Sequence, residues 1–531
     1  MKDEHYTKLS RRLFCLLLTG TILLLDILHF DAVAQAQNQP LGQGKDVVDI
    51  GSRLELFVDH FLIDEMTGTH LKLNKPRYAG VAFPMMEKDR PWENPFFGYF
   101  SIVQRPEKVQ IYYQAKTKMT PSGEPDEMTC YAESPDGISW SKPDLGLFEV
   151  FGTKKNNVVL DYSFRPVCHN FSVFYDTKPG VPENERYKGL GGLFPLRNNK
   201  HSNGLLAFVS GDGIHWNKLR EEAVVDKSLH PNEQSDTCQV SVFWSEPEQC
   251  YVCYLRCWIN RPGGIKNEHS RRWIGRTTSK DFLRWEKIQL MKYVKDDGQD
   301  QFYLPNTFPY FRAPHIYIAL PTRLCDFRRV LSPERLKAIG VPKHSWHDMS
   351  DIVLMTSRGG LSYDRTFRES FIRPGMADGN WSSRANFAAL GVVQTGPNEM
   401  SIYSKREYIS PSAHVGRFTL PLDRFASVNA PYTGGEFVTR PLKFSGNALC
   451  LNLSTSASGY VQTEIQDAQG QPIPGYALDD CLDTGGDEIA RKVEWKNKSS
   501  DLSALAGHTI RLRFVMKDAD LYAIQFTDLS S

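Results

Sequence analysis

The segment Ser134-Pro-Asp-Gly-Ile-Ser-Trp140 occurs four times along the chain in recognisable form. It returns as Ser210-Gly-Asp-Gly-Ile-His-Trp216, as Ser279-Lys-Asp-Phe-Leu-Arg-Trp285 and, more loosely, as Ser357-Arg-Gly-Gly-Leu-Ser-Tyr363. Each copy follows a strand-like run and ends in an aromatic residue. Asp-Gly, or a near equivalent, between two strands is typical of a hairpin turn, so we expect each copy to close one hairpin of a repeated sheet.

The spacing of these copies predicts the fold. They lie about 75 residues apart, which is room for the four short strands of a β-propeller blade. Residues 48–427 can hold five such blades, the fifth without a copy of the segment. We expect the strands of this fifth blade at 385–393, 400–405 and 417–420, with Leu54–Val58 as the outer strand that closes the ring. A parallel β-helix or two sandwiches in series is the alternative, but their repeats are shorter or do not recur in this way.

A different pattern begins near residue 428. Apolar and polar residues alternate with period two, as in Gly459–Ile465 and Thr509–Val515. This predicts a β-sandwich over 428–531 and therefore an all-β chain, a five-bladed β-propeller followed by a C-terminal β-sandwich. The sandwich could bind carbohydrate or only support the propeller, and both interpretations stay open.

The first 36 residues are typical of an export signal. Basic residues precede the apolar run Leu13–Phe30, and Ala34-Gln35-Ala36 offers a cleavage site for signal peptidase. Ser10-Arg11-Arg12-Leu13-Phe14 is similar to the twin-arginine export motif. We therefore expect a signal peptide at 1–36 and an exported protein, periplasmic or secreted; an uncleaved anchor is the alternative.

Composition restricts the partners of the protein. A net charge of +1 over 531 residues gives no electrostatic footprint for nucleic acid or for an anionic membrane surface. Aromatic residues make up 12% of the chain, and sugar-binding sites use aromatic faces, although aromatic-rich sheet cores are commoner. These features favour a neutral or modestly charged partner.

Three closely spaced cysteines do not form a metal site by our interpretation. Cys250, Cys253 and Cys257 lie in a β-branched and aromatic run that predicts a strand, with Cys250 on the opposite face from the other two. Thiols on two faces cannot close a tetrahedron around zinc. We expect buried structural cysteines, no metal and no cofactor.

The propeller fold predicts where chemistry would occur. The first strand of every blade starts at one face beside the central channel, so residues at or before these starts converge on one pocket. In the five expected blades these residues include Glu93; His169 and Asn170; Asp236; Tyr303 and Asn306; Arg384 and Asn386. At the same face, Asp351 would open a third-position strand, and Arg256 and Arg323 would end second-position strands.

Glu93 and Asp236 are the carboxylates of this set and come from alternate blades. Glycosidic cleavage requires a carboxylate pair, in which one group protonates the leaving oxygen and the other activates water or attacks the anomeric carbon. Taken singly, Glu93 could instead cap a turn and Asp236 could be a solvated loop acid. As a pair at equivalent positions, they are the predicted catalytic residues.

Several motifs carry a resemblance to a known family. They are Leu56-Phe57-Val58-Asp59, Pro91-Trp92-Glu93, Tyr131–Leu147, His169-Asn170-Phe171, Pro309–His315 and Leu354–Arg358. Over nearly the whole mature chain the sequence resembles exported bacterial proteins of planctomycete type. These proteins are described as glycosyl hydrolases of the family 32 and family 43 superfamily, the clan of invertase, levanase and arabinanase.

The resemblance implies roles that this chain fills only in part. In that superfamily an acidic residue opens the first strand of each of the first three blades, as base or nucleophile, as transition-state stabiliser and as acid. The corresponding residues here are Glu93, His169 and Asp236, so the middle acid is missing. The W-x-N-D-P-N-G and R-D-P motifs of family 32 are also absent.

The sequence thus favours an exported glycoside hydrolase that cleaves a plant or algal poly- or oligosaccharide with Glu93 and Asp236. The subsites would be lined by His169, Asn170, Tyr303, Asn306, Arg256, Arg323, Asp351, Arg384 and Asn386. One alternative is a non-catalytic carbohydrate-binding propeller. Another is a polysaccharide lyase, which would place His169 and a tyrosine beside clustered arginines that neutralise a uronate.

Overall fold

The computed structural model describes most of the chain after residue 45. The described residues are 46–85, 87, 90–94, 97–119, 125–194, 204–230, 238–260, 269–294, 300–496 and 500–528. The predicted signal peptide and Asp236 lie outside them. The described chain is nearly all-β, and its single α-helix is α2 (Pro333–Ala338). Within these ranges no helix is long and apolar enough to cross a membrane.

The strands between residues 97 and 290 form three four-stranded sheets, and in each of them every strand pairs antiparallel with the next. The first sheet contains β6 (Phe97–Gln104), β7 (Val109–Met119), β8 (Pro125–Ser134) and β9 (Val158–Leu160). The second contains β10 (Ser172–Tyr175), β11 (Tyr187–Gly191), β12 (Leu206–Ser210) and β13 (Asn217–Lys218). The third contains β14 (Ser241–Ser245), β15 (Cys250–Ile259), β16 (Arg271–Ser279) and β17 (Gln289–Leu290). Cys250, Cys253 and Cys257 are buried in β15, as expected.

The next segment divides into two sheets. One contains β20 (Thr307–Tyr310), β21 (Ala313–Ala319), β24 (Met355–Ser357) and β25 (Ser362–Asp364), with β18 (Lys292–Val294) parallel to β25. The other contains β19 (Phe302–Leu304), β22 (Thr322–Cys325) and β23 (Met349–Ile352). In sequence, the three strands of this smaller sheet lie after β17 and before β26 (Phe387–Ala388).

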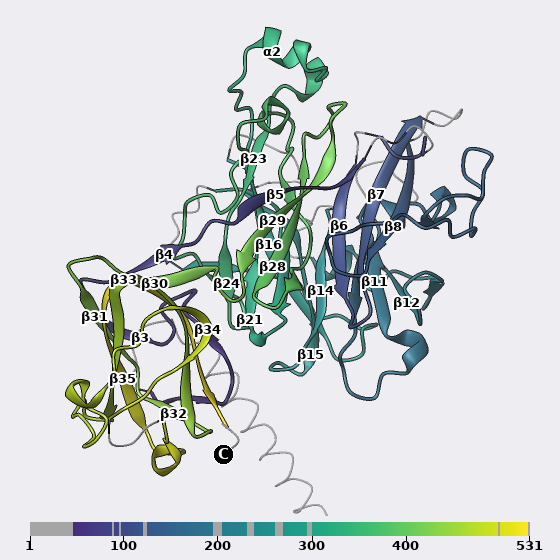
Figure 1. Ribbon diagram of the computed structural model, residues 1–531. Coiled ribbons are helices and arrows are strands. Elements are labelled where there is room, and N and C mark those ends of the chain that lie inside the picture. Colours follow the sequence, from purple (N-terminus) through teal and green to yellow (C-terminus); the bar gives the residue numbers. More distant parts are fainter. Residues whose placement is uncertain are drawn as a thin grey trace, which may run out of the picture. The chain divides into compact units, whose positions relative to one another are not determined.

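The last sheet of this series takes its edge strand from the N-terminal part of the chain. It contains β26 (Phe387–Ala388), β27 (Val393–Gly396), β28 (Glu399–Arg406) and β29 (His414–Pro421), and β5 (Arg77–Pro84) pairs antiparallel with β29. In Figure 1 the purple β5 runs beside the green β29. The prediction that Leu54–Val58 fills this place is wrong, because that stretch is buried and its Glu55–Leu56 pairs with β35 (Ile510–Thr527).

The repeated segment lies at the same place in three successive sheets. Its serine is the last residue of β8, β12 and β16, and its aspartate then accepts backbone N–H bonds from the residues two and three positions later. Asp136, Asp212 and Asp281 make these bonds at 2.7–2.9 Å. In the fourth copy, which follows β24, Gly359 has φ +94° and the Ser357 hydroxyl donates to backbone carbonyls instead. These are the predicted equivalent turns.

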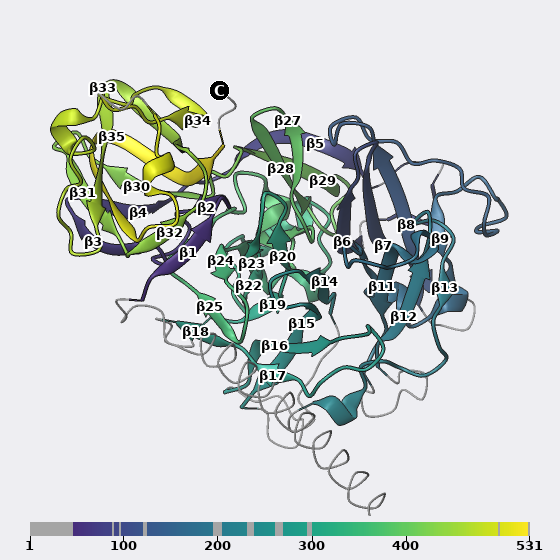
Figure 2. The ribbon, with the colours of Figure 1, turned by 90° about the horizontal axis from the view of Figure 1, so that it is seen from below.

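The first strands of the sheets lie next to one another. β6 contacts β10, β10 contacts β14, β14 contacts β20, and β26 contacts β6. The Asn306 side chain closes the remaining step by donating to the Ala388 carbonyl at 2.6 Å. In Figure 2, β6, β14 and β20 lie towards the middle and β9, β13 and β17 towards the rim. A largely apolar cavity of about 530 Å³ is lined by β6, β10, β14, β20 and residues 390–392. Each of the three four-stranded sheets, the sheet that contains β20 and the segment of the last sheet therefore contributes to its lining.

The C-terminal residues form a ten-stranded sheet together with N-terminal strands. Its members are β1 (Val48–Gly51), β2 (Glu55–Leu56), β3 (Ile63–Thr67), β4 (His70–Leu73), β30 (Ala426–Ala430), β31 (Gly435–Thr439), β32 (Leu442–Phe444), β33 (Ala448–Asp467), β34 (Asp487–Lys492) and β35. The predicted boundaries at 48 and 428 are therefore wrong. Residues 48–73 belong to this sheet, and residue 428 falls inside β30, which pairs with both β4 and β35.

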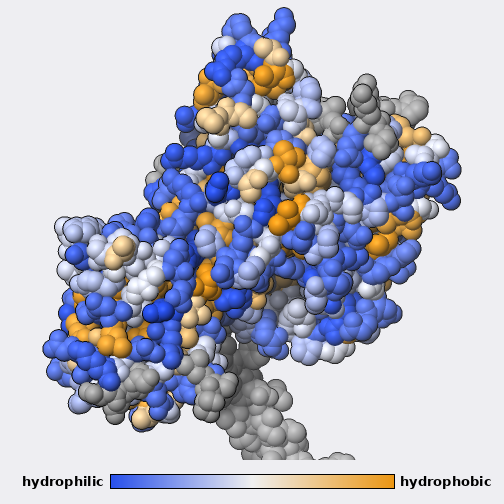
Figure 3. Space-filling model, in the orientation of Figure 1, coloured by the Kyte–Doolittle hydropathy of each residue, from blue (hydrophilic) through white to orange (hydrophobic). Residues whose placement is uncertain are grey.

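The surface seen in Figure 3 is mostly hydrophilic, with apolar side chains in small separate groups. Such scattered apolar residues are normal on a soluble surface and carry no functional argument by themselves.

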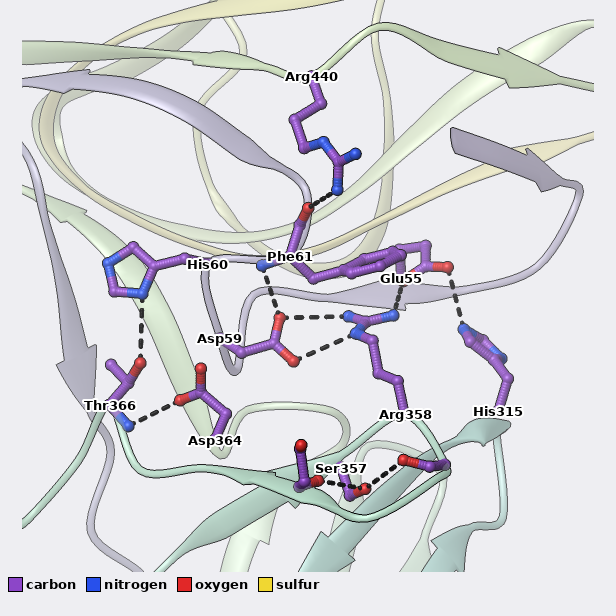
Figure 4. A network of polar contacts seen from close by, with 12 residues as sticks. Glu55, Asp59, His60, Phe61, His315, Ser357, Arg358, Asp364, Thr366 and Arg440 are labelled. Atoms are coloured by element: carbon purple, nitrogen blue, oxygen red, sulfur yellow. Dashed lines mark hydrogen bonds and ion pairs between the residues drawn. The ribbon is translucent and has the colours of Figure 1, made fainter. Parts of the chain in front are cut away.

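A buried ionic network joins the N-terminal segment to the turn after β24 (Figure 4). Arg358 donates to Glu55 at 2.8 Å and to Asp59 at 3.2 Å, and its guanidinium lies 3.9 Å from the centre of the Phe61 ring. His315 contacts the second oxygen of Glu55 at 3.0 Å. Burial works to raise the pKa of Glu55, but Arg358 and His315 hold it well below its ordinary value. The network fixes residues 55–59 against the sheets built from later sequence.

Candidate functional site

Four aromatic rings meet where the first strands of the sheets begin. His169 precedes β10, Tyr99 is in β6, Phe387 opens β26 and Tyr303 is in β19. Their ring centres are 5.4 Å apart for His169 and Tyr99, 6.3 Å for Tyr99 and Phe387, and 5.2 Å for Phe387 and Tyr303. The last two pairs are stacked. We call these four residues the ring cluster.

Cationic side chains surround the Tyr303 end of the ring cluster. The guanidinium carbons of Arg256, Arg384 and Arg272 lie 4.4, 5.4 and 5.7 Å from the centre of the Tyr303 ring. Arg384 also donates to the Tyr303 hydroxyl at 3.3 Å. Arg256 is 4% exposed, so its charge acts in a poorly hydrated environment where Coulomb interactions are strong.

This environment favours the ionised form of Tyr303. Burial works to raise the pKa of Tyr303, but the charges of Arg256 and Arg384 and a hydrogen bond from Tyr99 together lower it from its ordinary value of 10.0. Burial and the neighbouring Tyr303 raise the pKa of Tyr99 well above that value, so Tyr99 keeps its proton. The charges of its neighbours therefore make the Tyr303 phenol easier to ionise than an ordinary tyrosine.

At the other end of the ring cluster, His169 is held by a carboxylate. Its Nδ1 lies 3.0 Å from one oxygen of Glu127 in β8 and 3.2 Å from the other. Lys116 contacts the same carboxylate at 3.2 Å. Burial works to raise the pKa of Glu127, but His169 and Lys116 lower it to about 2, so this carboxyl is ionised at neutral pH. An ionised Glu127 fixes the Nδ1–H tautomer of His169 and leaves Nε2 for other partners.

Lys405 of β28 lies against the Phe387 ring of the ring cluster. It is 2% exposed, and its Nζ is 3.7 Å from the centre of the Phe387 ring and 3.5 Å from that of Tyr408. Burial and the charge of Arg384 lower the pKa of Lys405 well below its usual value. The two ring faces offset part of this effect, because they favour the ammonium form.

The structure brings four predicted site residues together and gives three others a structural role. His169, Tyr303, Arg256 and Arg384 belong to or surround the ring cluster, and their predicted role in substrate binding stays a prediction. Asn170, Asn306 and Asn386 are each at most 1% exposed, and the side-chain amide of each donates to backbone carbonyls. The Asn170 amide donates to the carbonyl of Cys238, which precedes β14 in the next sheet. The Asn306 amide donates to the carbonyl of Ala388 in β26, which belongs to the last sheet. The amides of these residues tie neighbouring sheets together, and the subsite prediction for them is wrong.

Arg323 and Asp351 lie together but in a separate cavity. Arg323 binds Asp351 through two hydrogen bonds of 2.9 and 2.7 Å, across the paired strands β22 and β23. Both line a cavity of about 590 Å³ at the edge of the smaller sheet.

The structure argues against a catalytic role for Glu93. Its side chain is 0% exposed, accepts a hydrogen bond from the Tyr113 hydroxyl, and pairs with Lys142 at 2.6 Å. Neither partner belongs to the ring cluster. Burial raises the pKa of Glu93 in spite of Lys142, as expected for a carboxylate that is shut away from water. Its predicted partner Asp236 lies outside the described residues.

We expect Glu93→Gln to lower stability and to leave catalysis unchanged. The amide would leave the buried Lys142 with only the more distant and partly exposed Glu87, at 3.4 Å, and breaking a buried pair typically costs about 3 kcal/mol. The control is the double variant Glu93→Gln/Lys142→Met, which removes both charges and should recover part of the loss in melting temperature. A large fall in turnover of the folded single variant would restore the catalytic assignment.

Tyr99, Phe387 and Lys405 are site residues that the sequence interpretation missed. Lys405 could have been found, because it lies near the end of the second strand of its sheet, as Arg256 does. Tyr99 gave no signal: its φ of +53° belongs to an irregular place in β6, where the pairing with β7 shifts between Gly98 and Ser101. A positive φ is uncommon at residues other than glycine, and the examples that do occur are concentrated at functional sites.

Comparison with known proteins gives a limited result. No family model matches the chain, and no curated protein does. Among solved structures, the chain is similar to an N-acetylgalactosamine deacetylase from F. plautii, with 12% identity over 66% of this chain and 96% of that one and a TM-score of 0.41. It is also similar to a family 43 arabinoxylan arabinofuranohydrolase from Bacillus subtilis, with 12% identity, 81% and 96% coverage and a TM-score of 0.36. A family 32 β-fructofuranosidase from Bombyx mori gives 12% identity, 87% and 95% coverage and a TM-score of 0.38.

Proposed function

We propose that the protein is a carbohydrate-active enzyme that acts on a glycan with acidic sugars, with its active site at the ring cluster. The observation that carries this proposal is the Tyr303 hydroxyl, which accepts a hydrogen bond from Arg384 at 3.3 Å in a ring that lies beside the buried charge of Arg256. The half-buried rings of Tyr303 and His169 suit the apolar faces of sugar rings. The arginines suit a carboxylate, because guanidinium groups bind carboxylates with two parallel bonds.

The scaffold of this proposal is a five-bladed β-propeller with a β-sandwich. Five features support it: the order of the sheets, the contacts of their first strands, the turns of the repeated segment, the shared cavity and the closure by β5. In such a ring the ring cluster lies at the channel end where the first strands start. We also propose export of the protein, on the basis of the basic and apolar residues before residue 37.

The chemistry that these residues support best is β-elimination. Ionised Tyr303 would take the proton from C5 of a uronate, the C4–O bond of the glycosidic link would break, and a C4–C5 double bond would form. His169, when its ring carries a proton on both nitrogens, would give the Nε2 proton to the leaving oxygen, while Glu127 accepts the Nδ1–H bond and orients the imidazole. Arg256 and Arg384 would neutralise the uronate carboxylate, which makes the C5 proton more acidic.

Hydrolysis is the second candidate, because the sequence resembles glycoside hydrolases. A hydrolase needs a carboxyl group that is protonated when the substrate binds. Glu127, with its pKa lowered to about 2, is unsuited to that role. Asp236 is the remaining sequence-predicted acid for a hydrolytic mechanism.

The test is a panel of glycans with two readouts. The protein without residues 1–36 is incubated with uronate-containing, sulfated and neutral polysaccharides, and each reaction is followed by ultraviolet absorbance of the unsaturated product and by released reducing ends. We expect an unsaturated product from a uronate polymer and none from its carboxyl-reduced form. Reducing ends without unsaturation would select hydrolysis, and binding without cleavage would make the protein a lectin. If the protein neither binds nor cleaves any of the glycans, the carbohydrate proposal is overturned.

A further inference from the structure

The cavity beside the smaller sheet is chemically distinct from the ring cluster. Its volume is about 590 Å³, and its lining includes Arg323, Arg328, Asp351, Ser370, Arg373 and Trp381. It is close to the proposed site in the sheet: β19, which carries Tyr303, pairs with β22, and Phe302 lies opposite Arg323. Neighbouring strands lie about 5 Å apart, so the cavity begins one strand away from Tyr303.

Positive charge in this cavity exceeds what its carboxylates neutralise. Asp351 is bound by both nitrogens of the Arg323 fork, and Asp300, which also lines the cavity, pairs with Arg365 at 2.6 Å. Arg328 and Arg373 are exposed, and among the residues with described positions neither has a carboxylate within ion-pair distance. Two guanidinium groups are therefore available to a ligand.

A buried hydroxyl gives independent evidence for a ligand in this cavity. Ser370 is 8% exposed and lines the cavity, and its Oγ has no hydrogen-bond partner within the described structure. A buried hydroxyl without a partner is costly, so such groups usually have one in the functional state. Trp381 adds a fixed ring, because its indole N–H donates to the Gly375 carbonyl at 2.7 Å.

We propose that this cavity is an accessory subsite for an anionic substituent of a saccharide, a sulfate ester or a carboxylate. Arg328 and Arg373 bind the anion, Ser370 donates to it, and the Trp381 ring packs against the sugar that carries it. The inference rests on the proposed carbohydrate function and extends it to a second sugar along the chain. The Arg323–Asp351 pair is a neutralised wall of the subsite rather than its anion receptor.

The experiment measures binding by calorimetry to the protein without residues 1–36, in the Tyr303→Phe background so that no turnover interferes. The probes are a sulfated oligosaccharide, a uronate oligosaccharide, a neutral oligosaccharide and inorganic sulfate. Arg328→Gln and Arg373→Gln should each weaken binding of an anionic probe about tenfold or more, since a charged hydrogen bond contributes more than a neutral one. Ser370→Ala should weaken it about threefold. Arg329→Gln, which changes an exposed neighbour outside the cavity lining, is the matched control and should have no effect.

The two anion sources are separated by the probes. A loss confined to the sulfated probe assigns the subsite to sulfate esters, and a loss confined to the uronate probe assigns it to carboxylates. Unchanged affinity for both in the arginine variants overturns the subsite. If the arginine variants bind with unchanged affinity but the protein cleaves a glycan, the subsite is overturned and the proposed function stands. If the arginine variants bind the sulfated probe more weakly but the protein cleaves no glycan, the subsite is supported and the enzyme proposal is contradicted.

Discussion

Replacing Tyr303 by phenylalanine should abolish most of the activity on an acidic glycan. The variant loses the hydroxyl that would accept the C5 proton but keeps the ring that stacks on Phe387 at 5.2 Å. Loss of a positioned base typically costs about 100- to 10,000-fold in turnover. The measurement is the initial rate of unsaturated-product formation. Since the ring packing is kept, we expect the melting temperature to change little.

The pH profile separates a base from a merely structural tyrosine. Because Arg256, Arg384 and Tyr99 lower the pKa of Tyr303, kcat/KM should rise with pH as Tyr303 loses its proton, at a lower pH than for an ordinary tyrosine. Arg384→Gln removes one of these cations, so the rising limb should move to higher pH. The ultraviolet signal of tyrosinate should move in the same direction.

Tyr175→Phe is the matched control. Tyr175 ends β10 and lines the apolar cavity at the other end of the first strands. Its loss should leave turnover and the pH profile unchanged. If Tyr303→Phe keeps more than a tenth of the activity, the base is another residue and elimination by Tyr303 is contradicted.

The repeated segment could be read from sequence because its structure is local. Asp136, Asp212 and Asp281 each accept from amides two and three residues later, so the turn depends on a few adjacent residues. Such Asx turns follow from the side chain's own reach to the nearby backbone. The sheets between the turns then follow from their spacing.

The closing strand could not be predicted because its partner is distant in sequence. β5 pairs with β29 through backbone bonds between residues such as Arg77 and Thr419. It is an edge strand with mostly exposed or half-buried residues and a glycine, Gly80, at φ +127°. The segment Leu54–Val58 resembles a strand more than β5 does, because it is mostly apolar. For the same reason it is buried in the structure and does not form the exposed edge strand.

The site was predicted only as far as position determines function. Placement at the starts of the first strands brought His169, Tyr303 and Arg384 to the ring cluster, but it also selected Asn170 and Asn306. An asparagine amide can face a ligand or replace a missing backbone bond between sheets, and its residue type does not distinguish these roles. Glu93 shows the same limit for a carboxylate, since Lys142, its buried partner, is 49 positions away.

Removing Arg358 should cause the largest loss of stability among single substitutions of the network in Figure 4. Arg358→Met would leave Glu55, with a side chain 0% exposed, and Asp59, 3% exposed, buried without the guanidinium that binds both. Breaking a buried ion pair from one side typically costs about 3–5 kcal/mol. We expect a large fall in melting temperature, and Arg358→Lys should recover only part of it, because an ammonium cannot bind both carboxylates as the fork does.

The control and the pH dependence use the same carboxylate. Arg53 also pairs with Glu55, at 2.6 Å, but its side chain is 40% exposed, so Arg53→Ala should cost about 1 kcal/mol or less. The folded-state pKa of Glu55 lies below its ordinary value of 4.5, so its contribution to stability is present above that pH and is lost as the pH falls below it. The difference in melting temperature between the unsubstituted protein and Arg358→Met should therefore shrink on acidification from neutral pH. A difference that stays constant, or an effect no larger than that of Arg53→Ala, would show that the network does not fix the N-terminal segment to the turn after β24.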